Sequence, residues 1–230
     1  MSLNIGHRGA AGLEPENTLR AFHCAAAEGA DALELDLRVT HDGHLVVLHD
    51  PIVERTTNGT GRLRELTLAE VRRLDAGLGA RVPTFAEVLD VTTLPIYAEL
   101  KELEAAELLA GEIFEGGARR ITTISFLPEA LRLMKRALPD QPVGLVLFGA
   151  PPDAAERALS LEADLVSLEA DHLDAEVVER CRRADLEVTT WTVNDTEQMR
   201  RVMELEVDGI VTDRPDLLAG TADSRLMWAS

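Results

Sequence analysis

Two histidines of this chain stand directly after short apolar runs of the kind that form buried strands. His7 follows residues 3–6, and His49 follows residues 45–48. A lone histidine at such a place is usually a polar filler or a capping group. Two of them at one end of a sheet can instead serve as an acid and a base, which makes His7 and His49 the candidate catalytic residues.

Three carboxylates interrupt runs that are otherwise apolar. Glu34 and Asp36 lie two apart in ALELDLRV and therefore share one face of a strand, and Glu99 has the same setting in IYAELK. A buried carboxylate is costly without a positive partner. That partner is either Arg8 or Arg38 in a salt bridge, or a hard divalent cation bound by all three acids. The chain lacks the Cys and clustered His spacing of zinc sites, so Mg or Ca is the expected metal.

Two cations and an indole complete the set of candidate residues. Arg8 follows His7, and Lys101 shares a strand face with Glu99. Only two of the 23 basic residues are lysine, so a lysine at this place favours a chemical role. Trp191, at the end of another strand, is either plain core or a flat apolar wall for a small alcohol. An acid and a base beside acids and cations suit the cleavage of a phosphodiester.

The fold must bring these residues together. Short β-branched or leucine-rich runs alternate with helical stretches along nearly the whole chain, which is typical of βα units around a parallel sheet. The expected strands are Leu3–Gly6, Ala32–Val39, Leu94–Leu100, Ile121–Ser125, Pro142–Phe148, Asp164–Leu168, Glu187–Trp191 and Gly209–Thr212. They predict an α/β fold, the (β/α)8 or TIM barrel, whose strands end at one mouth. A doubly wound sheet is the alternative, although no G-x-G-x-x-G follows the first strand.

One stretch departs from the alternation of strands and helices. Residues 51–82 contain turn signals and at most one short helix, and we expect a small lid-like insertion there, after the second strand. Residues 1–220 then form a single catalytic domain that includes the insertion. The segment 221–230 shows no pattern and is treated as a C-terminal tail. Its larger apolar residues pack either on the body or on a partner subunit, namely Leu226, Met227 and Trp228.

Composition narrows the range of partners. The chain has 230 residues, 46% of them hydrophobic, and carries 23 basic against 41 acidic residues for a formal net charge of −18. Such a field repels nucleic acids and anionic membranes, whereas a small phosphate ligand can still bind beside a metal ion. No segment has the pattern of a signal peptide or a membrane span, so we expect a cytoplasmic protein. Cys24 and Cys181 are expected in the core, and four histidines at the surface: His23, His41, His44 and His172.

A series of short motifs is similar to the pattern of one family. In order along the chain they are HRGA, PENT, ELDLRVT, HDGHLVVLHDP, RTTNGTG, LDAG, PTFAEVL, AELK, ISF, WTVN and GIVTDRPD, and they extend from His7 to Asp216. Each motif alone is weak, but the ordered set is specific. On these motifs the chain resembles the glycerophosphodiester phosphodiesterases.

The resemblance implies a barrel with a small insertion after the HD motif formed by His49 and Asp50. It implies that His7 and His49 are the catalytic pair and that Arg8 and Lys101 contact the phosphate. It also implies that the metal ligands are Glu34, Asp36 and Glu99. Glu16 and Asn17 of the PENT motif would line or buttress the site. Leu127 stands where the family commonly has a polar residue, so the sequence does not determine the preferred alcohol.

The implied reaction is a metal-dependent hydrolysis of glycerophosphodiesters, such as glycerophosphocholine, to an alcohol and sn-glycerol 3-phosphate. Two alternatives stay open: a lysophospholipase D-type phosphodiesterase on the same scaffold, and a barrel that binds phosphodiesters without turnover. The first requires an apolar groove that the insertion does not offer, and the presence of both histidines and all three acids disfavours the second. The expected partner is a small-molecule phosphodiester, with no stable membrane association. Oligomerisation of the chain, and which histidine is the acid, are left open.

Overall fold

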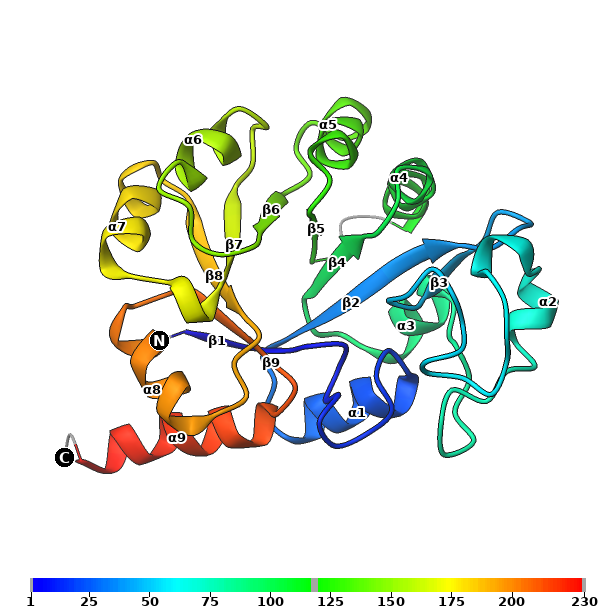
Figure 1. Cartoon of the computed structure of the whole chain (residues 1–230), viewed down its shortest axis with the longest axis horizontal. Helices are drawn as coiled ribbons and strands as arrows, with labels where there is room; N and C mark the ends of the chain where they lie inside the picture. Colours follow the sequence, from blue (N-terminus) through cyan, green and yellow to red (C-terminus); the bar gives the residue numbers. More distant parts are fainter. Residues whose placement is uncertain (1, 117–119, 229–230) are drawn as a thin grey trace.

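Eight parallel strands form a closed barrel in the computed structural model (Figure 1), which describes residues 2–116 and 120–228, with side chains up to residue 221. The strands are β1 (Leu3–Gly6), β2 (Ala32–Val39), β4 (Ile96–Leu100), β5 (Ile121–Ser125), β6 (Val143–Leu147), β7 (Leu165–Glu169), β8 (Glu187–Trp191) and β9 (Gly209–Thr212). Because β1 pairs with both β2 and β9, the ring is closed. The predicted (β/α)8 barrel is confirmed, and the doubly wound alternative, which requires an open sheet, is wrong.

Helices surround the barrel on its outside (Figure 1). They are α1 (Leu19–Ala27), α3 (Phe85–Val91), α4 (Glu104–Gly116), α5 (Pro128–Ala137), α6 (Ala154–Leu159), α7 (Ala175–Arg183), α8 (Thr196–Glu204) and α9 (Pro215–Trp228). Several begin at a side-chain cap; for example, the Asp195 carboxylate accepts from two backbone N–H groups of the first turn of α8. Their inner faces pack on the strands around fully buried side chains such as Phe22, Leu109 and Leu131.

The interior of the barrel changes character along the strands. Near the strand starts, inward-facing residues such as Ala32, Tyr97 and Leu165 belong to a small apolar cluster. Two residues further along, Glu34 follows Ala32 and Glu99 follows Tyr97, and both acids are buried. The apolar layer closes the bottom of the barrel, so the buried polar groups face only the mouth at the C-terminal ends.

The chain leaves the barrel between β2 and α3. β3 (Leu45–Val47) runs antiparallel to β2, with Val47 opposite Leu37, so that β2 extends beyond the ring as one arm of a hairpin. The insertion continues through η1 (Leu63–Glu65) and α2 (Leu68–Val71). Its apolar side chains form a separate cluster, which gives the insertion a defined shape: Val46, Leu48, Val53, Leu63, Val71, Ala76 and Val82.

Several expectations about single segments can be compared with this fold. Helix α9 continues through residues 221–228, where the sequence shows no pattern. Cys181 is buried and Cys24 is partly buried, and both thiols are free, as expected. The four histidines expected at the surface are exposed, and among the described residues every helix is too short or too polar to cross a bilayer. The packing expected at the C-terminus concerns side chains outside the described residues, namely Leu226, Met227 and Trp228.

Candidate active site

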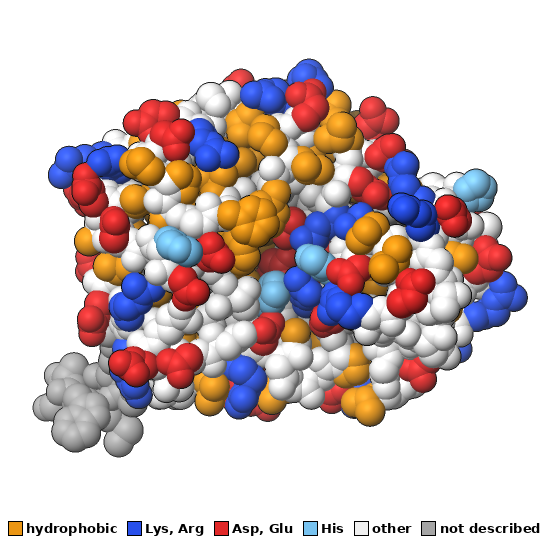
Figure 2. Space-filling model, in the orientation of Figure 1, with side chains coloured by type: hydrophobic (Ala, Val, Ile, Leu, Met, Phe, Trp, Pro, Cys, Tyr) orange, Lys and Arg blue, Asp and Glu red, His pale blue; other side chains and the backbone are white. Residues whose placement is uncertain are grey.

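The C-terminal strand ends surround a cavity of about 250 Å³. Figure 2 shows acidic side chains in the depth of this hollow, histidine and cationic side chains along one side, and apolar side chains along the other. Asp36 is buried next to the cavity on β2, with 1% of its surface exposed. The other predicted site residues all line the cavity: His7, Arg8, Glu34, His49, Glu99, Lys101 and Trp191.

The three carboxylates meet because β2 and β4 are neighbours. Asp36 stands directly opposite Glu99 in the parallel register, and Glu34 lies two residues earlier on β2. One oxygen of each acid lies within 4.8 Å of those of the other two, and all three residues are buried. Asp36 Oδ1 accepts no well-aligned hydrogen bond among the described residues. Three buried carboxylates whose oxygens lie this close together fit a hard divalent cation.

Lys101 offsets part of the negative charge of this cluster. Its Nζ lies 2.5 Å from Glu99 Oε1 and 2.9 Å from Asp36 Oδ1. Burial opposes ionisation of Asp36, but the charges of Lys101 and Arg8 outweigh burial and hold the pKa of Asp36 well below its usual range. Burial raises the pKa of Glu34 to about 7, and the charge of Asp36 acts in the same direction. Burial also raises the pKa of Glu99, so the protein's own cations do not fully compensate these two acids, and an added cation would favour their ionised forms.

Each predicted catalytic histidine contacts a carboxylate through Nδ1. His7 Nδ1 lies 2.6 Å from Asp213 Oδ1, and His49 Nδ1 lies 2.6 Å from Asp50 Oδ1. A carboxylate only accepts, so Nδ1 is the donor and Nε2 of each ring is left for proton transfer. Burial lowers the pKa of His7, but the hydrogen bond to Asp213 and the charge of Glu34 outweigh burial and raise this pKa above its ordinary value. For His49, burial dominates and lowers the pKa.

A tight turn after β1 carries Arg8 to the mouth. Arg8 has a φ of 51°, and its backbone N–H donates to Glu34 Oε2 at 2.9 Å. Its Nη1 donates to Glu16 Oε1 at 2.8 Å. Gly9 follows with a φ of 84°, and a Cβ there would lie 2.6 Å from the backbone of Ala21. The glycine of the HRG sequence is thus required by the close approach of α1 to this turn.

An aromatic wall forms the other side of the cavity. The rings of Phe126 and Phe148 stack with centroids 4.6 Å apart, and Trp191 meets them edge-on at 5.4 and 5.7 Å. Trp191 Nε1 donates to the carbonyl of Ser167 at 3.3 Å, which orients the indole. Phe148 is 73% exposed, so the wall continues from the cavity to the surface. These rings offer an apolar face beside the acids and cations.

Comparison with known proteins identifies this arrangement. The model of the glycerophosphoryl diester phosphodiesterase family matches residues 7–217. The chain belongs to this family. A glycerophosphodiester phosphodiesterase of Caldanaerobacter subterraneus subsp. tengcongensis is 35% identical over 94% of this chain and 96% of that protein. One of Bacillus subtilis is 32% identical over 94% of this chain and 84% of that protein.

The solved structures agree with the family assignment. An Oleispira antarctica phosphodiesterase, in complex with the product sn-glycerol-3-phosphate, superimposes with a TM-score of 0.91 and 27% identity, covering 95% of this chain and 96% of that one. A glycerophosphodiester phosphodiesterase of Agrobacterium tumefaciens gives 0.85 and 30%, covering 96% of this chain and 100% of that one. The predicted family, the enzyme class and the TIM barrel are therefore confirmed.

The structure of this phosphodiesterase adds residues that the sequence did not assign to the site. Asp213, which directly follows β9, reaches His7 because β9 lies beside β1. Arg55 of the insertion contacts Asp50; Arg55 opens the RTTNGTG motif, but the motif does not predict which residue it contacts. Two signals point to Asp213: it lies in the GIVTDRPD motif, and it directly follows the last strand, as His7 follows the first. Of the two PENT residues, Asn17 donates to Asp36 Oδ2 at 2.7 Å and buttresses the acids.

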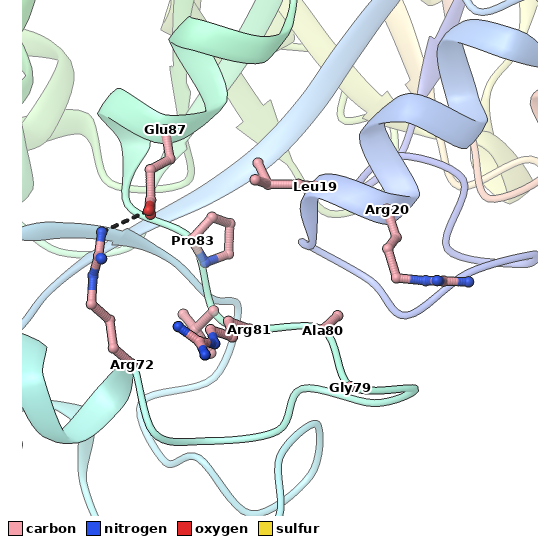
Figure 3. Close-up of a pocket in the computed structure, with 9 residues that line it drawn as sticks. Leu19, Arg20, Arg72, Gly79, Ala80, Arg81, Pro83 and Glu87 are labelled. Atoms are coloured by element: carbon pink, nitrogen blue, oxygen red, sulfur yellow. Dashed lines mark hydrogen bonds and ion pairs between the residues drawn. The ribbon is translucent and has the colours of Figure 1, made fainter.

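A second hollow, of about 280 Å³, lies between α1, the insertion and α3 (Figure 3). Arg72 spans it to Glu87 at 2.6 Å, and Arg20 is paired with Glu14. The residues that line it include no histidine and a single acid. This hollow therefore lacks the groups that phosphodiester cleavage requires, and the cavity at the barrel mouth is the candidate active site.

Proposed function

We propose that this phosphodiesterase hydrolyses glycerophosphodiesters, such as glycerophosphocholine, to an alcohol and sn-glycerol 3-phosphate in a metal-dependent reaction. One observation supports it above the others: two histidines with carboxylate-bound Nδ1 atoms border the same cavity as a buried cluster of three acids. The Oleispira antarctica relative was solved with sn-glycerol-3-phosphate as its product, which supports the same product here.

Glu34, Asp36 and Glu99 would hold the metal. Their carboxylate oxygens are the ligands preferred by hard cations, and the cluster contains neither the thiolates nor the histidines of zinc sites, so Mg or Ca is the proposed cofactor. Such a cation, when bound, supplies charge neutralisation for the phosphodiester. Lys101 and Arg8 already contact the acids, so their remaining donors are in place for phosphoryl oxygens.

The two histidines move protons at Nε2. One imidazole accepts a proton from the attacking water, whose oxygen bonds to phosphorus, while the other donates a proton to the oxygen of the leaving alcohol, so that the P–O bond breaks and the alcohol departs neutral. Asp213 and Asp50 keep His7 and His49 in the required orientation through Nδ1. Arg8 and Lys101 stabilise the charge that develops on the phosphoryl oxygens.

The aromatic wall would receive the leaving alcohol. The π faces of Phe126, Phe148 and Trp191 attract a quaternary ammonium group, which supports choline as one such alcohol. The exposed Phe148 also extends the apolar surface outward. That observation favours a second candidate, a lysophospholipase D-type reaction, in which the wall would accept the acyl chain of a lysophospholipid.

Choline release from glycerophosphocholine and from lysophosphatidylcholine, with and without EDTA, tests both candidates. We expect hydrolysis of glycerophosphocholine that EDTA abolishes and that Mg or Ca restores. His7→Ala or His49→Ala should lower kcat by about 100-fold or more while metal content is unchanged. His172→Ala, at an exposed histidine outside the cavity, is the matched control. EDTA-resistant turnover would remove the metal from the proposal, and normal turnover in both active-site variants would remove the histidines.

A further inference from the structure

Arg55 of the insertion binds two carboxylates with one guanidinium group. Its Nε and Nη2 lie 2.5 and 3.3 Å from the two oxygens of Asp50. Its Nη1 and Nη2 lie 2.7 and 2.8 Å from the two oxygens of Glu16. Exposed ion pairs usually contribute little to the stability of a protein, because the entropy lost in ordering two long side chains offsets their attraction. Four contacts in fork geometry are different, because they fix the orientation of both carboxylates.

Both of these carboxylates lead to residues of the cavity. The Asp50 oxygen that lies 3.3 Å from Arg55 also lies 2.6 Å from His49 Nδ1. Glu16 Oε1, which accepts from Arg55 Nη2, also accepts from Arg8 Nη1 at 2.8 Å. Arg55 is therefore the centre of a continuous chain of contacts that joins a histidine after β3 to an arginine after β1.

The charges along this chain explain why its centre must be a cation. Asp50 and Glu16 come from two loops, and without Arg55 they would bring two negative charges together beside the cavity. The hydrogen bonds from Arg55 are the main reason that the pKa of Asp50 is lowered to about 2. At Glu16, burial opposes ionisation, but Arg55 and Arg8 outweigh it and lower the pKa. Both acids therefore stay ionised, as accepting from His49 and Arg8 requires.

We propose that Arg55 is a positioning residue, which fixes His49 and Arg8 relative to each other and so couples the insertion to the reacting groups. The inference rests on the roles proposed above for those two residues. Arg55 is separated from the cavity residues by Asp50 and Glu16, so its loss should reduce kcat more than it raises KM. Outer contacts of this kind typically contribute about 10- to 100-fold to activity.

Three variants test this role in the full chain with glycerophosphocholine as substrate. Arg55→Ala should lower kcat by about 10- to 100-fold. Millimolar guanidinium, far below denaturing concentrations, should restore part of that kcat by occupying the vacated position. Arg55→Lys should be intermediate, because an ammonium keeps the charge but cannot bind two carboxylates in fork geometry. Arg72→Ala is the matched control, since Arg72 also lies in the insertion, is 44% exposed against 46% for Arg55, and among the described residues forms an ion pair only with Glu87 (Figure 3).

The possible results separate the inference from the function on which it rests. A kcat of Arg55→Ala within twofold of the wild type overturns the inference, and so does an equal loss in Arg72→Ala, which would indicate a general weakening of the insertion. If Arg55→Ala does not fold, Arg55→Lys decides by the same criterion, with denaturation midpoints as the check on folding. Activity retained by both His49→Ala and Arg8→Ala would instead refute the roles of His49 and Arg8.

Discussion

Asp213 gives the sharpest test of how the fold supports the histidines. Its Oδ1 lies 2.6 Å from His7 Nδ1, and its Oδ2 accepts from Asn194 Nδ2 at 2.5 Å. Asp213→Asn preserves size but replaces one acceptor with a donor NH2 group. If the new amide turns its oxygen to His7, its NH2 faces the NH2 of Asn194; if it turns the other way, its NH2 faces Nδ1–H. The first orientation removes the hydrogen bond with Asn194, the second either removes the one with His7 or forces the tautomer that carries the proton on Nε2, and both remove the negative charge beside His7.

The size of the effect follows from the hydrogen bond that is lost. A hydrogen bond to a charged group contributes about 1.5–3 kcal/mol. At about 1.4 kcal/mol for each factor of ten in rate, kcat should fall by about 10- to 150-fold. Asp213 raises the pKa of His7, so the substitution lowers that pKa, and the protonated form of His7 is lost at a lower pH than in the wild type. The limb of the kcat–pH profile that reports His7 should therefore shift to lower pH.

The assay compares kcat, KM and pH profiles at saturating divalent cation. Asp195→Asn is the matched control: it makes the same charge change near the mouth, but the carboxylate caps α8, and Asn caps a helix equally well. In a His7→Ala background Asp213→Asn should have no further effect, because its effect acts through that ring. An Asp213→Asn enzyme with kcat within twofold of the wild type, or with full additivity to His7→Ala, would refute this reasoning.

Three other predictions follow from the contacts of the site. Glu99→Gln should weaken divalent-cation binding by about 10-fold or more, measured by calorimetry, and unchanged affinity would exclude Glu99 as a ligand. Lys101→Arg should lower kcat although the charge is kept, because a planar guanidinium does not fit the space 2.5 Å from Glu99 and 2.9 Å from Asp36; wild-type kinetics would contradict this. Asp50, whose pKa is lowered from 3.8 to about 2, contributes stability that is present above its unfolded-state pKa and lost as pH falls toward the folded value. Between pH 5 and pH 3 the free energy of unfolding, measured with urea, should fall by about 1 kcal/mol because of this group. The fall should be smaller in Arg55→Ala, and equal falls in both proteins would disprove the prediction.

The sequence predicts the parts of the site that depend on local geometry. Glu34 and Asp36 share a strand face because side chains alternate along any strand, and Glu99 joins them because consecutive βα units place their strands side by side. His7 and His49 are found in the same way, as polar residues directly after apolar runs. These inferences need only the strand period and the rule that parallel strands end at one mouth.

The contacts that the sequence does not predict are long-range. Asp213 supports His7 across 206 positions of the chain, and the contact exists only because β9 closes the barrel onto β1. Arg55 reaches Glu16 across 39 positions, through the path of an insertion that has no regular period. The aromatic wall is similar, since the contact of Phe148 with Trp191 depends on how the ends of two strands converge at the mouth. No periodicity along the chain encodes such pairings.

The polar side and the aromatic side of the cavity come from different parts of the sequence. Every group proposed to bind the metal, contact the phosphate or move a proton lies between residues 7 and 101, on or directly after β1 to β4. The aromatic wall is encoded later, at the ends of β5, β6 and β8. Recombination between β4 and β5 would therefore exchange the surface that meets the leaving alcohol while keeping the bond-breaking groups. The part of the chain after β4 must still keep Asp213, which contacts His7, and Asn194, which donates to Asp213. Chimaeras joined at that point are a direct route to relatives that release different alcohols by the same chemistry.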